Sequence, residues 1–198
     1  RFATIIFKED AQLRLNDLKT LSLQDFKNIK NDIIAFNNKI KKQLINLGTE
    51  ACKIIEANNL TVNDFHSKKN GIGGLFFKLA KLNNNDKLPN ELSETIKKNI
   101  STETWYAQTT DTHIKNTIDG IKNELQTIAN EIIKIYSNEI LIYNFYEILL
   151  NSIHKVALIS EIEKIFEELK QVENFVHISE FNKKIADIVL KESVPYIY

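Results

Sequence analysis

Residues 22–59 read SLQDFKNIKNDIIAFNNKIKKQLINLGTEACKIIEANN, with apolar side chains recurring every three or four positions. This spacing is typical of an amphipathic α-helix. Ser22, followed three residues later by Asp25, fits a capping box at the start of that helix. Gly48 costs a helix about 1 kcal/mol relative to alanine without breaking it. The stretch therefore predicts one helix of about 55 Å, at 1.5 Å per residue.

The predicted stripe along this helix comprises Phe26, Ile29, Ile33, Phe36, Ile40, Leu44, Leu47, Ala51 and Ile54. A compact protein of 198 residues would be only about 40 Å across. A helix longer than that diameter predicts an elongated molecule.

The middle of the chain is different, because its glycines, prolines and an asparagine-rich stretch separate short apolar runs. We expect three short helices there, near residues 61–66, 73–82 and 89–99. Trp105 and Tyr106 follow in a loop, where packing between helices is favoured over stacking on a base.

A heptad pattern begins after Asp111. Its apolar positions are Ile114, Ile118, Ile121, Leu125, Ile128, Ile132 and Ile135. After a bend predicted at residues 136–139, a second long helix should cover residues 140–174, with its first half, up to Ile159, buried on several sides. The carboxylates Glu161, Glu163, Glu167 and Glu168, interspersed with Lys164 and Lys170, suggest a solvated face further along. Ser179 is predicted to cap a last helix.

The fold class expected is thus all-α, an elongated array of about three long antiparallel helices plus several short helices, forming a single domain over residues 1–198. The composition agrees, with 43% hydrophobic and 26% charged residues but only 5 Gly and 2 Pro for turns. Neither a run of about 20 apolar residues nor a signal peptide is evident, so we expect a cytoplasmic protein that does not bind membranes.

Motifs for catalysis are missing from the sequence. The glycine-rich stretch NGIGGLFF at residues 70–77 lacks the Lys-Ser/Thr of a phosphate-binding loop, which favours turn chemistry. The four histidines are too far apart to suggest a metal site. Cys52 is the only cysteine, and its apolar neighbours favour plain packing. We expect no catalytic residue, metal or cofactor in this chain.

Charge is distributed unevenly along the neutral chain. Residues 1–100 hold 17 basic and 11 acidic side chains, and the remainder holds 9 and 15. Solvated faces account for most such splits, but the excess also permits an anionic partner. The candidates for phosphate contact are Lys39, Lys41, Lys42, Lys68, Lys69, Lys78 and Lys81. They predict weak, salt-sensitive binding to DNA.

The last part of the chain adds a family resemblance. Residues 144–198 read NFYEILLNSIHKVALISEIEKIFEELKQVENFVHISEFNKKIADIVLKESVPYIY. This stretch resembles the region that precedes the Walker B strand in the bacterial UvrD/RecB-like superfamily 1 DNA helicases. The likeness rests on three motifs, NFY at 144–146, ISEFN at 178–182 and PYIY at 195–198, and GIGGLFFKLAK at 71–81 resembles a further segment of the same family.

The resemblance implies that this chain is the helical accessory subdomain, called 1B, of a helicase motor domain, ending just before the Walker B motif. The parent would be an ATP-dependent DNA helicase that uses ATP and Mg²⁺. Its Walker A and Walker B motifs are not in this sequence, so the chain itself should not hydrolyse ATP. Its implied partners are DNA, the motor domains and a partner helicase or nuclease subunit.

A second interpretation comes from the heptads alone. The seam from Ile114 to Ile135 could pair with a helix of another protein, as in a free-standing coiled-coil interaction module.

Overall fold

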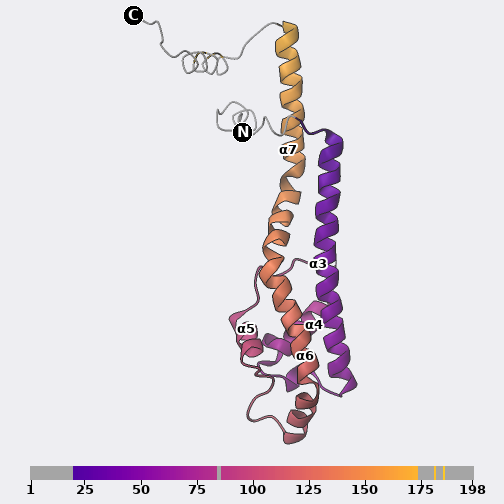
Figure 1. The fold of residues 1–198 in the computed structure, drawn as a ribbon, viewed down its shortest axis with the longest axis vertical. Coiled ribbons are helices and arrows are strands. Elements are labelled where there is room, and N and C mark those ends of the chain that lie inside the picture. The colour runs from indigo at the N-terminus through magenta and orange to yellow at the C-terminus, as the bar shows by residue number, and fades with distance from the viewer. Residues whose placement is uncertain (1–19, 84–85, 174–180, 182–184, 186–198) are drawn as a thin grey trace, which may run out of the picture. The chain divides into compact units, whose positions relative to one another are not determined.

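The computed structural model describes residues 20–83 and 86–173, together with the single positions 181 and 185. Every regular element in these ranges is helical, which confirms the all-α class. The elements are α3 (Leu23–Ala57), the 3₁₀ turns η1 (Val62–Asp64) and η2 (Lys68–Asn70), α4 (Ile72–Ala80), α5 (Glu94–Ser101), α6 (Thr112–Asn138) and α7 (Ile140–Glu173). Figure 1 shows their order. The last helix predicted, capped by Ser179, lies outside the described residues.

Helix α3 begins and ends as its local sequence dictates. The Ser22 N–H donates to the Asp25 carboxylate at 2.8 Å, and the Asp25 N–H donates to the Ser22 hydroxyl at 3.2 Å, which confirms the capping box. The Ser22 hydrogen bonds lower the pKa of Asp25. At the other end Asn59 adopts a left-handed φ of 55°, and the Leu60 N–H bonds back to the Ile55 carbonyl. Asparagine tolerates this conformation, so it ends the helix.

The chain divides into two compact units, one of residues 1–31 and 150–198 and the other of residues 32–149. Both long helices, α3 and α7, contribute to both units. In the unit of residues 32–149, the Phe36 ring packs edge-on against Tyr146 at 5.3 Å between centroids. In the other unit, the Lys30 Nζ atom lies 3.2 Å from the His154 Nε2 atom. Figure 1 shows that α3 and α7 run in opposite directions, so the two helices are antiparallel within each unit.

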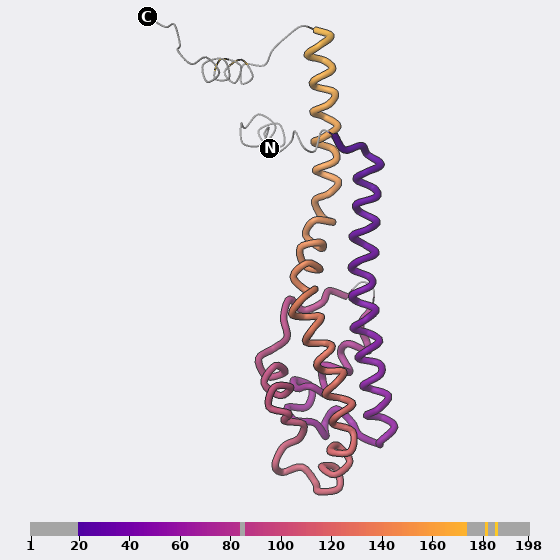
Figure 2. The backbone as a smooth tube through the Cα atoms, in the orientation of Figure 1, coloured from indigo at the N-terminus to yellow at the C-terminus, as the bar shows by residue number. Residues whose placement is uncertain are grey.

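The junction between α6 and α7 differs from the predicted bend. Only Glu139 interrupts the helix, and helical hydrogen bonds continue on both sides, from Glu139 N–H to Ile135 and from Tyr143 N–H to Glu139. Figure 2 shows α7 leaving this point in the direction in which α6 arrives. Helix α3 is therefore antiparallel to both, whereas α6 and α7 are not antiparallel to each other.

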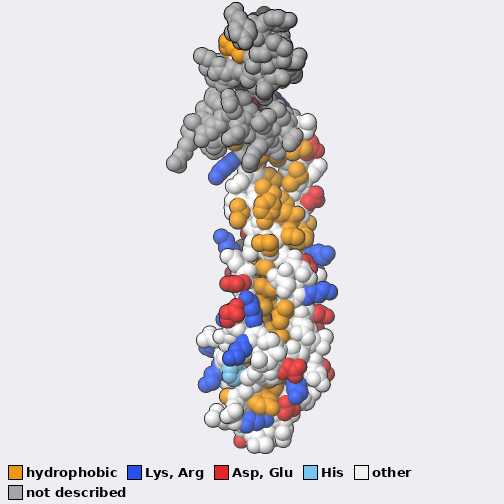
Figure 3. Space-filling view, turned by 60° about the vertical axis from the view of Figure 1, so that its left-hand side comes forward, with side chains coloured by type: hydrophobic (Ala, Val, Ile, Leu, Met, Phe, Trp, Pro, Cys, Tyr) orange, Lys and Arg blue, Asp and Glu red, His pale blue; other side chains and the backbone are white. Residues whose placement is uncertain are grey.

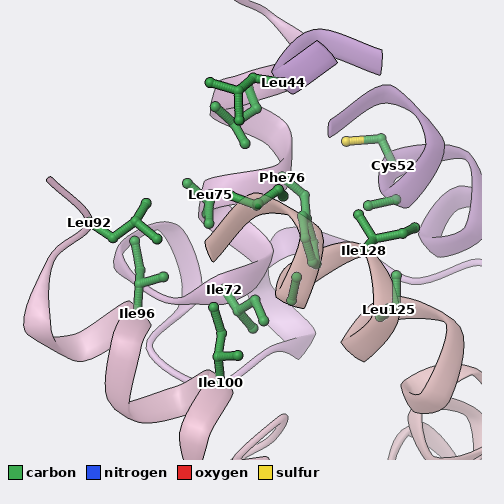
Figure 4. Packing of buried hydrophobic residues seen from close by; sticks show 14 of the residues in the cluster. Leu44, Cys52, Ile72, Leu75, Phe76, Leu92, Ile96, Ile100, Leu125 and Ile128 are labelled. Carbon is green, nitrogen blue, oxygen red and sulfur yellow. The ribbon is translucent and has the colours of Figure 1, made fainter. Parts of the chain in front are cut away.

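The main core lies in the unit of residues 32–149 and joins α3, α4, α5, α6 and the start of α7. Figure 4 shows Leu44 and Cys52 of α3, Phe76 of α4, Ile100 of α5 and Ile128 of α6 converging there. The heptad residues Ile118, Ile121, Leu125, Ile128, Ile132 and Ile135 are all buried in this core. The seam therefore packs inside the chain, which leaves it closed to a partner helix.

Helix α3 approaches α4 closely at Gly48. A Cβ atom at this position would lie 2.6 Å from the Ala80 nitrogen and 2.9 Å from the Phe76 carbonyl oxygen. Cβ atoms in real proteins essentially never come this close to other heavy atoms. The glycine, which the sequence presents only as a weak point of α3, is what lets the two helices touch.

The first half of α7 is not buried on several sides, contrary to the prediction. Ile140 and Tyr143 face the core, but Leu141, Phe145 and Ile148 are 77%, 58% and 67% exposed. The core covers one side of the helix only, and the run of apolar residues does not reveal which sides are covered. None of the helices in the described ranges combines the length and apolarity that a bilayer crossing requires.

Candidate nucleic-acid interface

A hollow of about 910 Å³ opens between α4, the segment of residues 86–93 and α5. Its apolar wall includes Leu75, Phe77, Leu79, Leu82, Leu92 and Ile96. Tyr136 of α6 also lines it and is 8% exposed. The volume is in the range of ordinary ligand sites in proteins.

Four lysines line this hollow, namely Lys69, Lys78, Lys81 and Lys87. None of them forms an ion pair with a residue in the described ranges. The carboxylate in the lining belongs to Glu91, and it lies 3.7 Å from the Lys97 ammonium. Lys97 also bonds Glu94 at 2.8 Å, and this hydrogen bond raises the Lys97 pKa. The hollow is therefore positively charged and complements an anion.

Local sequence explains why these lysines meet. Lys78 and Lys81 are three positions apart at the end of α4, so they lie on one side of it. Lys69 belongs to η2, whose backbone lies against α4: a Cβ at Gly74 would be 2.1 Å from the Lys69 carbonyl oxygen. Lys87 follows a turn in which the Asn83 N–H donates to the Asp86 carboxylate at 2.8 Å.

The seven lysines predicted from the sequence fall into four groups. Lys69, Lys78 and Lys81 come together at the hollow. Lys39 and Lys42 are exposed on the side of α3 opposite its buried stripe, and they do not line the hollow. Lys41 is only 7% exposed, so little of its side chain could reach a phosphate.

The remaining lysine, Lys68, lines a second hollow of about 660 Å³ between residues 63–70 and 107–114, which Lys69 also borders. This lining also contains Asp64 and Asp111. With two lysines and two aspartates, the lining of this second hollow has no net charge, so it is a weaker match for a polyanion than the first hollow.

Lys87 was missed by the sequence reasoning. It stands alone in the asparagine-rich stretch NNNDKLPN, where no cluster or periodicity marks it. Only tertiary structure brings it to the lysines of α4, so no sequence signal could have found it.

The glycines of NGIGGLFF serve close packing at the start of α4, not the turn that the sequence predicts: Gly71 is the N-cap of this helix, and Gly73 and Gly74 lie within it. A Cβ at Gly71 would lie 2.0 Å from the His66 carbonyl oxygen, and one at Gly73 would lie 3.0 Å from the Phe65 side chain. The space beside these glycines is filled by the chain itself. They leave no cradle for the phosphates of a nucleotide.

Two other candidate residues are packed as predicted. Trp105 is 3% exposed and meets Phe65 edge-on at 6.4 Å between ring centroids, so it cannot stack on a base. Cys52 is buried beside α4, and burial raises the pKa of its thiol to about 11, with Glu56 adding to the effect and Lys81 opposing it. A thiol with this pKa is a poor nucleophile at neutral pH.

In the ranges that the structure describes, no group of three His, Cys, Asp or Glu side chains could hold a metal ion. Compared with known proteins, the chain matches no family model, no curated protein and no solved structure.

Proposed function

We propose that the chain is a DNA-contacting accessory subdomain of a bacterial UvrD/RecB-like ATP-dependent helicase that acts in DNA repair and recombination. The observation that carries the proposal is the convergence of Lys69, Lys78 and Lys81 with Lys87 around one hollow. Lys69, Lys78 and Lys81 are also among the seven lysines that the sequence indicates as candidates for phosphate contact.

The contact would be electrostatic rather than catalytic. Lysine ammonium groups bind backbone phosphates as point charges and carry no sequence information. The lysines would therefore hold the nucleic acid in position while the motor domains of the parent protein bind ATP and Mg²⁺ and perform hydrolysis. We place this work in the cytoplasm, with the motor domains and a helicase or nuclease subunit as partners.

Fluorescence anisotropy with a labelled forked DNA, over a series of salt concentrations, tests the DNA contact. We expect weak binding whose logarithm falls linearly with log salt. Replacing Lys69, Lys78, Lys81 and Lys87 with glutamine should reduce that slope by about 3 to 4, because each phosphate contact contributes about 0.9 for duplex DNA.

A matched control replaces four exposed lysines elsewhere, Lys27, Lys53, Lys134 and Lys155, with glutamine. The net charge changes equally in both variants, so only the position of the charges differs. Equal slopes for the two variants would show that DNA is attracted by overall charge and would refute the lysine site.

The helicase origin has a separate test in the gene. A reading frame that continues past codon 198 into an acidic Walker B strand would support it. A stop codon directly after Tyr198 would refute the helicase assignment but would leave the DNA-binding result standing.

A further inference from the structure

The second half of α7 exposes a regular apolar stripe, defined as Leu158, Ile162, Ile165, Leu169 and Val172. Their exposed fractions lie between 40% and 77%. The spacing of 4, 3, 4 and 3 places all five on one side of the helix, which is the arrangement of a helix–helix seam. Figure 3 shows a run of hydrophobic side chains on one face of the region that contains α3 and α7.

The opposite side of this half of α7 is buried but partly polar. Ala157 and Ser160 are buried there, and so is Glu163, which was predicted to belong to a solvated face. Two lysines are also directed away from the stripe: Lys164 bonds the Leu21 carbonyl at 2.8 Å, and Lys170 bonds Glu167 at 2.8 Å. The helix therefore buries polar groups inside its unit and leaves its most regular apolar face outside.

The size of the stripe suits a partner helix. Five Leu, Ile and Val side chains about half exposed offer on the order of 400 Å² of apolar surface. A standard interface takes about 800 Å² from each partner, of which roughly 60% is apolar. The stripe alone supplies most of that apolar share.

Charges beside the stripe decide what kind of helix it fits. Glu161 and Glu168 flank it on one side, immediately before Ile162 and Leu169, and Glu173 flanks it at the end. Lys164 pairs with Glu161 at 3.0 Å, whereas Glu168 has no ion pair among the described residues. Lys164 therefore lies beside Glu161 and offsets its charge, whereas Glu168 and Glu173 leave the flanks negatively charged beside Leu169 and Val172.

We propose that this stripe is a docking face for a basic amphipathic helix of a partner protein. Such a helix would place its apolar residues on Ile162, Ile165 and Leu169 and its lysines or arginines against Glu161 and Glu168. A second copy of this chain is disfavoured, because it would bring the same glutamates together on either side of the seam. The proposal is independent of the DNA-contact function.

The test uses the whole 198-residue chain and two synthetic helical peptides of four heptads. One peptide has leucine at positions a and d and lysine at e and g, and the other has glutamate in place of those lysines. We expect the lysine peptide to bind at least ten-fold more tightly, as measured by fluorescence anisotropy at low salt. The double variant Ile165→Gln/Leu169→Gln should lose at least ten-fold of that affinity while keeping its circular dichroism spectrum.

Charge reversal separates this docking from non-specific adhesion of an apolar peptide. The variant Glu161→Lys/Glu168→Lys should reverse the preference in favour of the glutamate peptide. The control Glu124→Lys/Glu131→Lys, at exposed positions of α6, changes the charge equally and should leave the preference unchanged. The proposal is overturned if neither peptide binds, if both double reversals act alike, or if sedimentation shows a dimer that Ile165→Gln/Leu169→Gln dissociates.

Discussion

The Asn37 amide of α3 donates a hydrogen bond of 2.7 Å to the Glu147 carboxylate of α7, across 110 positions of sequence. Asn37 is 4% exposed, so this bond lies inside the interface between the two helices. The adjacent pair, Phe36 and Tyr146, supplies the apolar contact. A hydrogen bond to a charged acceptor in a desolvated place is among the stronger kinds in proteins. It therefore helps to set which residues of α3 and α7 face each other.

We expect Asn37→Ala to lower the free energy of unfolding by about 1–3 kcal/mol, because the Glu147 carboxylate loses this donor. Urea denaturation of the purified chain measures the change. The neighbouring Asn38 is exposed, so Asn38→Ala should change stability by less than about 0.5 kcal/mol. If the two variants were equally stable, the hydrogen bond would contribute nothing to the pairing.

Two glycines in long helices should respond in opposite ways to the same substitution. Gly48→Ala places a methyl group within 2.6 Å of the α4 backbone, so α3 and α4 must move apart, and we expect a loss of about 1–3 kcal/mol or more. Gly120→Ala in α6 has no atom within 4 Å of the new methyl group. It should stabilise the protein by up to about 1 kcal/mol through helix propensity.

Thermal unfolding of both glycine variants distinguishes packing from propensity. A rise in the melting temperature of Gly48→Ala would contradict the close approach of the two helices, since propensity alone favours alanine at both sites.

Periodicity predicted the long helices well because each depends on local signals. The capping residues Ser22 and Asp25 and the seam from Ile118 to Ile135 need no knowledge of the rest of the chain. The predicted helix at residues 89–99 begins too early, because the start of α5 depends on the Ser93 hydroxyl, which accepts from the Ile96 N–H. Pro89 and Leu92 precede that cap and belong to the wall of the hollow.

What periodicity could not predict is which side of a helix meets other chain segments. The pattern predicts Ile29 and Ile54 in the stripe of α3, yet Ile29 is 36% exposed, and Ile55, not Ile54, is fully buried. The same limit explains the exposed residues of α7 and the position of Lys87. These features depend on tertiary packing, which a pattern of three and four residues does not encode.

Cys52 should react slowly in the folded protein. A thiol pKa of about 11 leaves about 100-fold less thiolate near pH 8 than a pKa of 9.0 would, and burial limits access further. We expect iodoacetamide to modify it at least 100-fold faster in denaturing urea. Because the folded pKa is above the unfolded one, Cys52 contributes stability that is full below about pH 9 and is lost as pH rises towards 11. Equal alkylation rates in both states would contradict this burial.

Tyr136 offers the clearest test of the buried side of the hollow. Its hydroxyl is buried without a hydrogen-bond partner among the described residues. Burial, with a smaller effect from Tyr143, raises its pKa to about 12 from the usual 10.0. Since a buried hydroxyl without a partner costs free energy, Tyr136→Phe should be neutral or stabilising by about 1 kcal/mol near pH 7. Chemical denaturation of both proteins measures this difference.

The same substitution should also change how stability depends on alkaline pH. Because the folded pKa of Tyr136 exceeds the unfolded value, stability does not depend on this group below about pH 10 and falls as pH rises from about 10 to 12. Phenylalanine has no proton to lose, so the stability advantage of Tyr136→Phe should grow by about 1.4 kcal/mol between pH 9 and pH 11. Parallel pH curves for the two proteins would instead mean that the hydroxyl reaches solvent through the hollow. The lysine-lined hollow would then be wetter and more polar at its base than its Leu75 and Leu79 walls imply.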